Sequence, residues 1–216
     1  MCGRIGYVAT PSRLVAAYPW LREARQVPAR YNIAPTDPVV VVDGARADLV
    51  VWGIDGRRGG LFNVRAETAL QPGPYCDLLL TSRVLVPASH FYEWRRLGSR
   101  RLPVAISRRD GAPINLAGLM GRREGVPAVT ILTTTANGRL EALHDRMPVV
   151  LSDDDARAWV REKLGLEQLA AMLRPCPDDH LELRAASPLV NSVRNDGPEL
   201  LDPDALPEHY QLDLFP

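Results

Sequence analysis

Short runs of apolar and β-branched residues recur along most of the chain, and turn-forming residues separate them. Gly, Pro and Asp bound these runs, which is typical of strands in a sheet. The pattern predicts strands over residues 38–43, 47–54, 83–89, 102–108, 114–120, 126–136 and 180–187.

Other segments have the spacing and the end signals of helices. Pro19 interrupts the first of them. The clearest helix starts at Ser152, a preferred N-cap residue, with Asp155 three positions later and acidic residues in the first turn. Gly165 is expected to end it. The spacing predicts helices over residues 11–27, 152–165 and 166–174.

No repeat, low-complexity linker or shift in composition divides the chain. We therefore predict one α+β domain over residues 1–216, built mostly of antiparallel or mixed β-sheet, partly barrel-like, with a few flanking helices. An acidic C-terminal tail begins at about residue 202. Nineteen prolines and sixteen glycines imply many turns and long loops, where functional residues tend to lie.

The composition is that of a globular protein, with 46% hydrophobic and 24% charged residues. No apolar run approaches the roughly 18 residues of a membrane-spanning helix. The first residues, MCGRIGYVATPSRL, place an arginine where a signal peptide would begin its apolar region. We therefore expect a cytoplasmic protein with no membrane partner, and we expect it to be a monomer.

Cysteine and histidine usage argues against structural cross-links. The three cysteines and four histidines are far apart and include no Cys-x-x-Cys pair and no zinc-ligand spacing. We expect no disulfide framework, no metal and no cofactor. These residues are Cys2, Cys76 and Cys176, and His90, His144, His180 and His209.

Net charge is zero, but its distribution is uneven. Residues 91–125 contain eight arginines and three acids, whereas residues 196–216 contain six acids and no Lys or Arg. This asymmetry predicts a basic surface and a separate acidic tail.

Four segments are dense in polar residues and are expected to be loops: RYNIAPT (30–36), FNVRAET (62–68), HFYEW (90–94) and ALHDRMPVVL (142–151). Each polar residue has a structural interpretation when taken alone. Asn32 fits a turn, Asn63 a loop cap, Glu93 an ion pair with Arg95, and His144 a surface hydrogen bond.

Taken together, the segments point to a resemblance to one protein family. MCGR, RYNIAPT, NVRAET, FYEW and HDRMPVVL, in this order, resemble the SOS-response-associated peptidase family, also called abasic-site-processing proteins. The likeness continues to VNSVRNDGPELL (190–201). The resemblance implies a covalent crosslink to abasic sites in single-stranded DNA, with related lyase and self-processing activities.

Cys2 suits that chemistry. Once Met1 is removed, its α-amine condenses with the aldehyde of a ring-opened abasic sugar to form an imine, and its thiol closes a thiazolidine ring. An α-amine has a reference pKa of about 7.7–8.0, so roughly a tenth or more is neutral at pH 7. The thiol is expected to need only modest help from nearby positive charge to ionise.

The resemblance also implies roles for other residues. Glu93 matches the acid–base residue, His144 the group that contacts the opened sugar or an adjacent phosphate, and Asn63 the amide that holds the terminal amine and the sugar. The positions that match holders of backbone phosphates are Arg4, Asn32, Arg65 and Arg146, with Thr133 a weaker candidate.

Two features depart from the family pattern. Arg57 and Arg58 stand where aromatic residues usually precede the Asn-x-Arg motif, which predicts binding that depends more on charge and salt. His90 replaces a usual glycine and is expected to add a titrating group near Glu93.

Two other functions are open. An N-terminal cysteine also serves as the nucleophile of glutamine-hydrolysing amidohydrolases, with its own amine as base. A module that binds single-stranded DNA without covalent chemistry is the other alternative.

Overall fold

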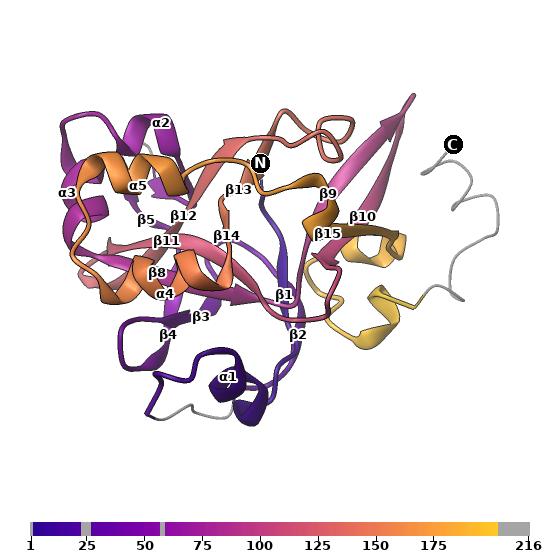
Figure 1. The fold of residues 1–216 in the computed structure, drawn as a ribbon. Helices are drawn as coiled ribbons and strands as arrows, with labels where there is room; N and C mark the ends of the chain where they lie inside the picture. Colours follow the sequence, from indigo (N-terminus) through magenta and orange to yellow (C-terminus); the bar gives the residue numbers. More distant parts are fainter. Residues whose placement is uncertain (1, 23–26, 57–58, 203–216) are drawn as a thin grey trace.

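The structure, a computed structural model, describes residues 2–22, 27–56 and 59–202. These residues form the predicted α+β fold, with helices at the margins of two main sheets (Figure 1). The strands are β1 (Ile5–Tyr7), β2 (Arg30–Ile33), β3 (Pro38–Val42), β4 (Ala47–Trp52), β5 (Ile54–Gly56), β6 (Gly59–Leu61), β7 (Asn63–Arg65), β8 (Arg83–Ala88), β9 (His90–Leu97), β10 (Arg100–Arg108), β11 (Ile114–Arg123), β12 (Val126–Thr135), β13 (Arg146–Pro148), β14 (Val150–Leu151) and β15 (Leu181–Ala185). The α-helices are α1 (Pro11–Ala17), α2 (Ala66–Ala69), α3 (Pro74–Thr81), α4 (Asp153–Arg161) and α5 (Leu166–Met172), and the 3-10 helices are η1 (Asp178–His180), η2 (Pro188–Asn191) and η3 (Pro198–Leu200).

The larger sheet closes into a barrel, which confirms the barrel-like part of the prediction. Strands β12, β4, β3, β8 and β11 follow one another around it, and β11 pairs with β12 to complete the ring. β4 and β7 run parallel to β12, so the sheet is mixed. All four valines of β3 are buried, since both of its faces are covered. Closure leaves the ring strands without an open edge.

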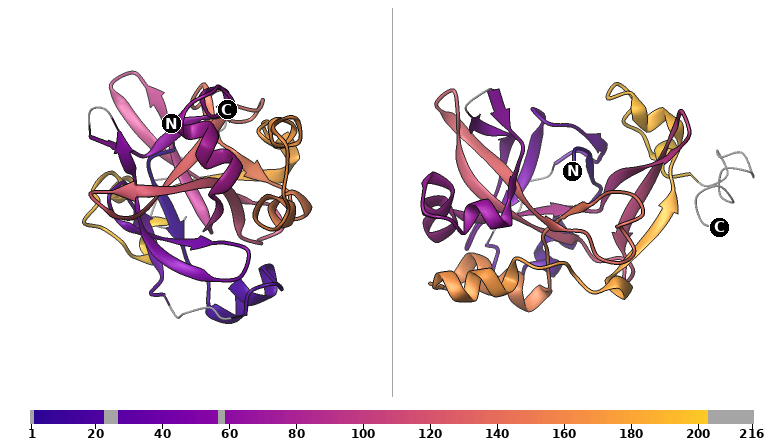
Figure 2. Two further views of the ribbon diagram at one scale, coloured as in Figure 1. Left: turned by 90° about the vertical axis from the view of Figure 1, so that its left-hand side faces the viewer. Right: turned by 90° about the horizontal axis from the view of Figure 1, so that it is seen from above.

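The smaller sheet is antiparallel and has the order β15-β10-β9-β1-β2. Its strand β1 carries the beginning of the chain, because Ile5 pairs with Phe91 of β9 and with Ile33 of β2. Seen from above, the chain entering β1 lies between the barrel strands and the β9–β10 hairpin (Figure 2). The fold therefore places the first residues where the two sheets meet.

The four polar segments expected as loops contain strands instead. β2, β7, β9 and β13 run through them, so the loop prediction is wrong. The physical reason is that each strand also contributes an apolar residue to the core, and alternate side chains of a strand point to opposite faces. These buried residues are Ile33, Val64, Phe91 and Met147.

The best helix prediction is confirmed at its start and wrong at its end. Ser152 caps α4, and its hydroxyl accepts a 3.1 Å hydrogen bond from the N–H of Asp155. The helix ends at Arg161, and Leu164 then packs into the core at 8% exposure. Gly165 is the N-cap of α5 instead of the end of α4.

His90 does not lie beside Glu93. The two residues are three positions apart on β9, so their side chains point to opposite faces of the sheet. The ring of His90 packs against Gly6, where an added Cβ would lie 2.1 Å from a ring atom. Burial lowers the pKa of His90 to about 4, which leaves the ring neutral at pH 7. The expected titrating group near Glu93 is therefore a wrong prediction.

Among the described residues, no helix has the length and apolar character needed to cross a membrane. Over the same residues, no group of three or more His, Cys, Asp or Glu side chains is placed to hold a metal ion. Cys2, Cys76 and Cys176 are free thiols, and all three are buried. The acidic tail, from residue 203 onward, lies outside the described residues.

Candidate active site

Cys2 lies three positions before the start of β1, where the smaller sheet meets the barrel. Its side chain is fully buried. The amide Nδ2 of Asn63 donates a 2.7 Å hydrogen bond to the backbone oxygen of Cys2. Asn63 begins β7, which pairs with β12 of the barrel. This bond therefore ties the start of the chain to the barrel wall.

Glu93 reaches the same place from β9. The N–H of Tyr92 donates a 2.9 Å hydrogen bond to the backbone oxygen of Arg4, which aligns the next residue of β9 with the residues before β1. Glu93 is only 5% exposed. Burial raises the pKa of its carboxyl above the usual range, and the positive charges of the amino terminus and His144 oppose this rise. A carboxyl with a raised pKa beside a reacting group is suited to transfer protons.

Burial also dominates the protonation state of the Cys2 thiol. It raises the pKa of the thiol far above the usual range, and the negative charge of Glu93 raises it further. The expectation that modest help from nearby positive charge suffices for ionisation is wrong, because burial raises the pKa by more than the positive amino terminus lowers it. The thiol keeps its proton, so a base must remove it during a reaction.

His144 lies between β12 and β13, with one third of its side chain exposed. Its Nδ1 accepts a 2.9 Å hydrogen bond from the backbone N–H of Arg146 and lies 2.8 Å from a carboxylate oxygen of Asp145. One ring nitrogen serves one of these partners at a time. When Nδ1 accepts from Arg146, the neutral ring carries its proton on Nε2 and can donate it to a ligand.

Arg146 is held in place by acidic and backbone oxygens. Its guanidinium makes paired hydrogen bonds of 2.6 and 2.8 Å to the two carboxylate oxygens of Glu67, and a 2.6 Å bond to the backbone oxygen of Thr133. The same pairing lowers the pKa of Glu67. Arg146 and Thr133 are buried, whereas Arg65 is exposed. Among the phosphate ligands predicted on the barrel side, Arg65 is therefore the one that is exposed to solvent.

On the side of the smaller sheet, Arg4 and Asn32 belong to one hydrogen-bond network. Nη1 of Arg4 donates hydrogen bonds of 2.8 Å to Oδ1 of Asn32 and to the backbone oxygen of Val190. Asn32 is fully buried, and its Nδ2 donates to three carbonyls of residues 190–195. The guanidinium of Arg4 lies 5.8 Å from the centroid of the Trp94 ring. Asn32 thus positions Arg4 and the 190–195 segment instead of presenting its own amide to solvent.

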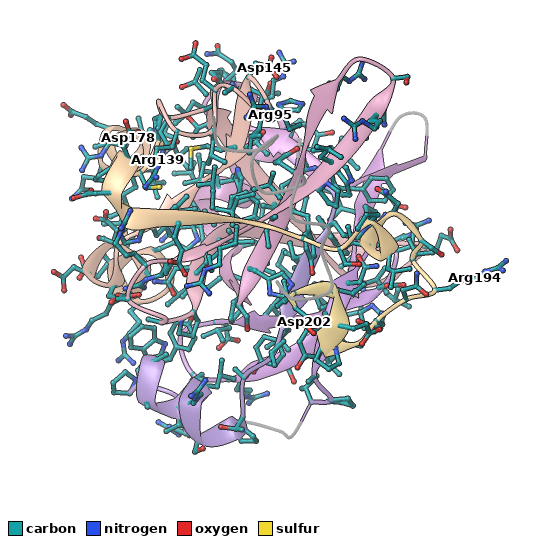
Figure 3. All side chains as sticks on the ribbon, turned by 90° about the vertical axis from the view of Figure 1, so that its right-hand side faces the viewer. Arg95, Arg139, Asp145, Asp178, Arg194 and Asp202 are labelled. Carbon is teal, nitrogen blue, oxygen red and sulfur yellow. The ribbon has the colours of Figure 1, made fainter. Side chains whose placement is uncertain are left out.

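Sequence reasoning missed the acidic residue that anchors this segment. Asp196 accepts hydrogen bonds of 2.6 and 2.8 Å from the backbone N–H groups of Tyr31 and Asn32, and it pairs with Arg30. Its only sequence signal is its place in the stretch 190–201 that continues the family likeness. Arg194 projects outward from the same segment (Figure 3).

Four predicted catalytic residues therefore come together from four separate segments: Cys2, Asn63, Glu93 and His144. We call this group the inter-sheet site. Arg4 and Asn32 flank it on the side of the smaller sheet, and Arg65, Thr133 and Arg146 on the barrel side. Arg57 and Arg58 lie outside the described residues. Contact with DNA by any of these residues stays a prediction.

Known proteins share this arrangement of sequence and fold. The chain is 32% identical to the abasic site processing protein YoqW of Bacillus subtilis, over 94% of this chain and 99% of that protein. It is 30% identical to the abasic site processing protein YedK of Escherichia coli, over 94% of this chain and 100% of that protein.

Solved structures agree with the fold. The X-ray structure of a protein from Bacteroides thetaiotaomicron matches with a TM-score of 0.80 at 18% identity, over 93% of this chain and 98% of that chain. A phage-related protein from Bordetella bronchiseptica matches with a TM-score of 0.71 at 28% identity, over 85% and 93%. The family described as SOS response associated peptidase (SRAP) matches residues 1–193, so the chain belongs to this family.

Proposed function

We propose that the protein captures abasic sites in single-stranded DNA as a covalent thiazolidine on Cys2, once Met1 has been removed. The observation that carries the proposal is the position of Cys2, whose backbone is held by Asn63 and whose thiol lies in the field of the buried Glu93. The names of the relatives YoqW and YedK, abasic site processing proteins, support the same substrate.

The α-amine acts first. An unprotonated amine adds to the aldehyde carbon of the opened sugar and forms a carbinolamine. Protonated Glu93 gives its proton to the departing hydroxyl, which leaves as water, and an iminium ion and the Glu93 carboxylate remain. The raised pKa of Glu93 favours this proton donor at neutral pH. Asn63 holds the Cys2 backbone while the amine attacks.

The thiol acts second. The Glu93 carboxylate takes the thiol proton as the sulfur adds to the iminium carbon, which closes the thiazolidine and restores protonated Glu93. Because the thiol pKa is raised, sulfur stays protonated until the iminium ion has formed beside it. The order amine before thiol follows from this difference in environment.

The same imine supports the associated activities. Loss of a proton from the sugar carbon next to the imine shifts its electron pair and breaks the carbon–oxygen bond to the 3′ phosphate, which is the lyase reaction. Crosslink reversal runs the capture steps backwards. We assign to His144 a hydrogen bond from Nε2–H to the opened sugar or a neighbouring phosphate, and to Arg4 and Arg65 the flanking phosphates. Self-processing is the removal of residues ahead of Cys2.

Purified protein and an abasic single-stranded oligonucleotide test the proposal on a denaturing gel. Wild-type protein with a verified Cys2 terminus is expected to give a heat-stable adduct. Cys2→Ser keeps the amine, so it is expected to give an adduct only when borohydride reduces the imine. A Cys76→Ala/Cys176→Ala protein retains the terminal aminothiol and should react as wild type.

The alternatives predict other outcomes. A non-covalent DNA-binding module would shift the oligonucleotide on a native gel and leave no adduct on a denaturing gel. An amidohydrolase would release ammonia from glutamine through Cys2 and would not discriminate abasic from intact DNA. A heat-stable adduct that persists in Cys2→Ala would contradict the thiazolidine.

A further inference from the structure

The β9–β10 hairpin extends past its neighbouring strands. Within the described residues, β1 pairs with β9 at His90 and Phe91, and β15 pairs with β10 from Val104 onward. Residues 94–103 therefore form a two-stranded ribbon with no strand on either side. The ribbon projects beyond the rest of the smaller sheet (Figure 1).

Two arginines face each other across this ribbon. Arg96 pairs directly with Arg101 in the antiparallel register, and both side chains are exposed. In the part of the chain that the structure describes, neither has a hydrogen bond or an ion pair with another side chain. Like charges directly opposite one another destabilise a strand pair. Arg95 and Arg100 point to the other face of the ribbon and are engaged within the protein.

The face that carries this pair is the face of β9 opposite Glu93, because Arg96 and Glu93 are three positions apart, and it approaches the inter-sheet site through Trp94 and Arg4. Arg96 follows Trp94 by two positions, so both lie on one face of β9. Arg4 lies over the Trp94 ring on that side. A row of cation, aromatic ring and paired cations therefore leads outward from Arg4, which flanks the inter-sheet site. Residues 95–101 include no aromatic and no acidic residue, so their chemistry fits phosphate and not base stacking.

We propose that Arg96 and Arg101 bind backbone phosphates of the DNA flanking the abasic site, outside the inter-sheet site. The proposal rests on the proposed function and adds the path that the DNA follows beyond the lesion. The phosphates belong either to a continuing single strand or to a flanking duplex, whose major groove admits a two-stranded ribbon. Binding an anion between the two guanidinium groups relieves their mutual repulsion.

The test measures non-covalent binding by fluorescence anisotropy over a range of salt concentrations, in a Cys2→Ala background. The probes are an abasic 5-mer, an abasic single-stranded 20-mer and the same 20-mer with one flank made duplex. The variant under test carries Arg96→Gln and Arg101→Gln in this Cys2→Ala background. The matched control is Arg13→Gln/Arg157→Gln, which removes two exposed arginines from α1 and α4.

If both arginines contact phosphates, the Arg96→Gln/Arg101→Gln variant should show a shallower slope of log affinity against log salt concentration than its parent. The expected difference is about 1.4 for a single-stranded flank or about 1.8 for a duplex flank. Binding of the 5-mer is expected to stay unchanged. An unchanged slope on both long probes, or an equal change in the control, overturns the proposal. The thermal midpoint of the variant should not fall, because a like-charge pair has been removed.

The two proposals fail separately. If wild-type protein forms no covalent adduct but the ribbon variant loses salt dependence, the thiazolidine is refuted and the phosphate contact stands. If the adduct forms and the slope of the ribbon variant does not change, the phosphate contact is refuted and the thiazolidine stands.

Discussion

The side-chain amide of Asn63 donates a 2.7 Å hydrogen bond to the backbone oxygen of Cys2, across 61 positions of sequence. This oxygen belongs to the residue whose amine and thiol are proposed to react. The bond restrains the peptide group between Cys2 and Gly3, and we expect it to limit the directions open to the α-amine once Met1 is removed. The side-chain oxygen of Asn63 is buried and has no hydrogen-bond partner among the described residues. It is available to accept a bond from a ligand or from the freed amine.

Replacing Asn63 by Ala is expected to slow crosslinking roughly tenfold, since a single hydrogen bond contributes about 0.5–1.5 kcal/mol. The measurement is the single-turnover rate of adduct formation with an abasic oligonucleotide. The thermal midpoint should change little, because Asn63 is only half-buried. An unchanged rate would show that the bond does not orient the nucleophile.

Replacing Glu93 by Gln is expected to stabilise the fold at pH 8 and to abolish efficient crosslinking. Burial raises the pKa of Glu93 in the folded state, above an unfolded value of about 4.3. The folded state therefore binds the proton more tightly, and stability is lost as pH rises through the folded pKa. The melting-temperature gap between Glu93→Gln and wild type should close near pH 4. A gap independent of pH would contradict the assigned shift.

Glu67 shows the opposite direction of pKa shift from Glu93. Its hydrogen bonds to Arg146 lower its pKa in the folded state. Its contribution to stability is therefore present above the unfolded pKa and is lost as pH falls through the folded pKa. Glu67→Gln is expected to lower the melting temperature at pH 7, with the deficit shrinking in acid. Paired pH–melting series on the two variants should show changes of opposite sign.

Gly6→Ala is expected to destabilise the protein by about 1–3 kcal/mol, the usual effect of overpacking a core. The reason is the His90 ring, 2.1 Å from where the new methyl group would lie. In Gly6→Ala/His90→Gly the methyl group has room, so the double variant should be more stable than the sum of the single effects predicts. Urea denaturation of the four proteins measures this coupling. Strict additivity would show that the contact is not the cause.

Asn32→Ala is expected to release the 190–196 segment. The amide of Asn32 donates to three carbonyls of this segment and accepts from Arg4. Removal takes this donor from the carbonyls of Ser192 and Asn195, whereas the carbonyl of Val190 keeps its bond from Arg4. The cost is about 1–3 kcal/mol for each group that water cannot reach. Hydrogen exchange should accelerate in residues 189–196 while the barrel strands stay protected. Uniform acceleration across the chain would indicate global destabilisation instead.

Much of the fold is readable from local pattern. The valine run of β3 and the long apolar runs of β11 and β12 predict strands because a buried sheet requires them. Ser152 predicts the start of α4 because its hydroxyl reaches a backbone N–H three residues on. Both signals act within a few residues. The polar strands β2, β7, β9 and β13 escaped prediction because their short runs mix core and site residues.

The sequence by itself determined which groups the chain carries: a thiol on Cys2, an amine on the adjacent carbon if Met1 is removed as proposed, and carboxylate, imidazole and amide groups elsewhere. These features follow from residue identity and covalent bonding, which do not depend on the fold. Only the tertiary structure decided which groups reach Cys2, that Asn32 is buried, and that His90 points away from Glu93. The contacts responsible join residues as far apart as Arg4 and Val190. Burial and charge at a site depend on such distant neighbours, and these set the pKa values on which the reaction depends.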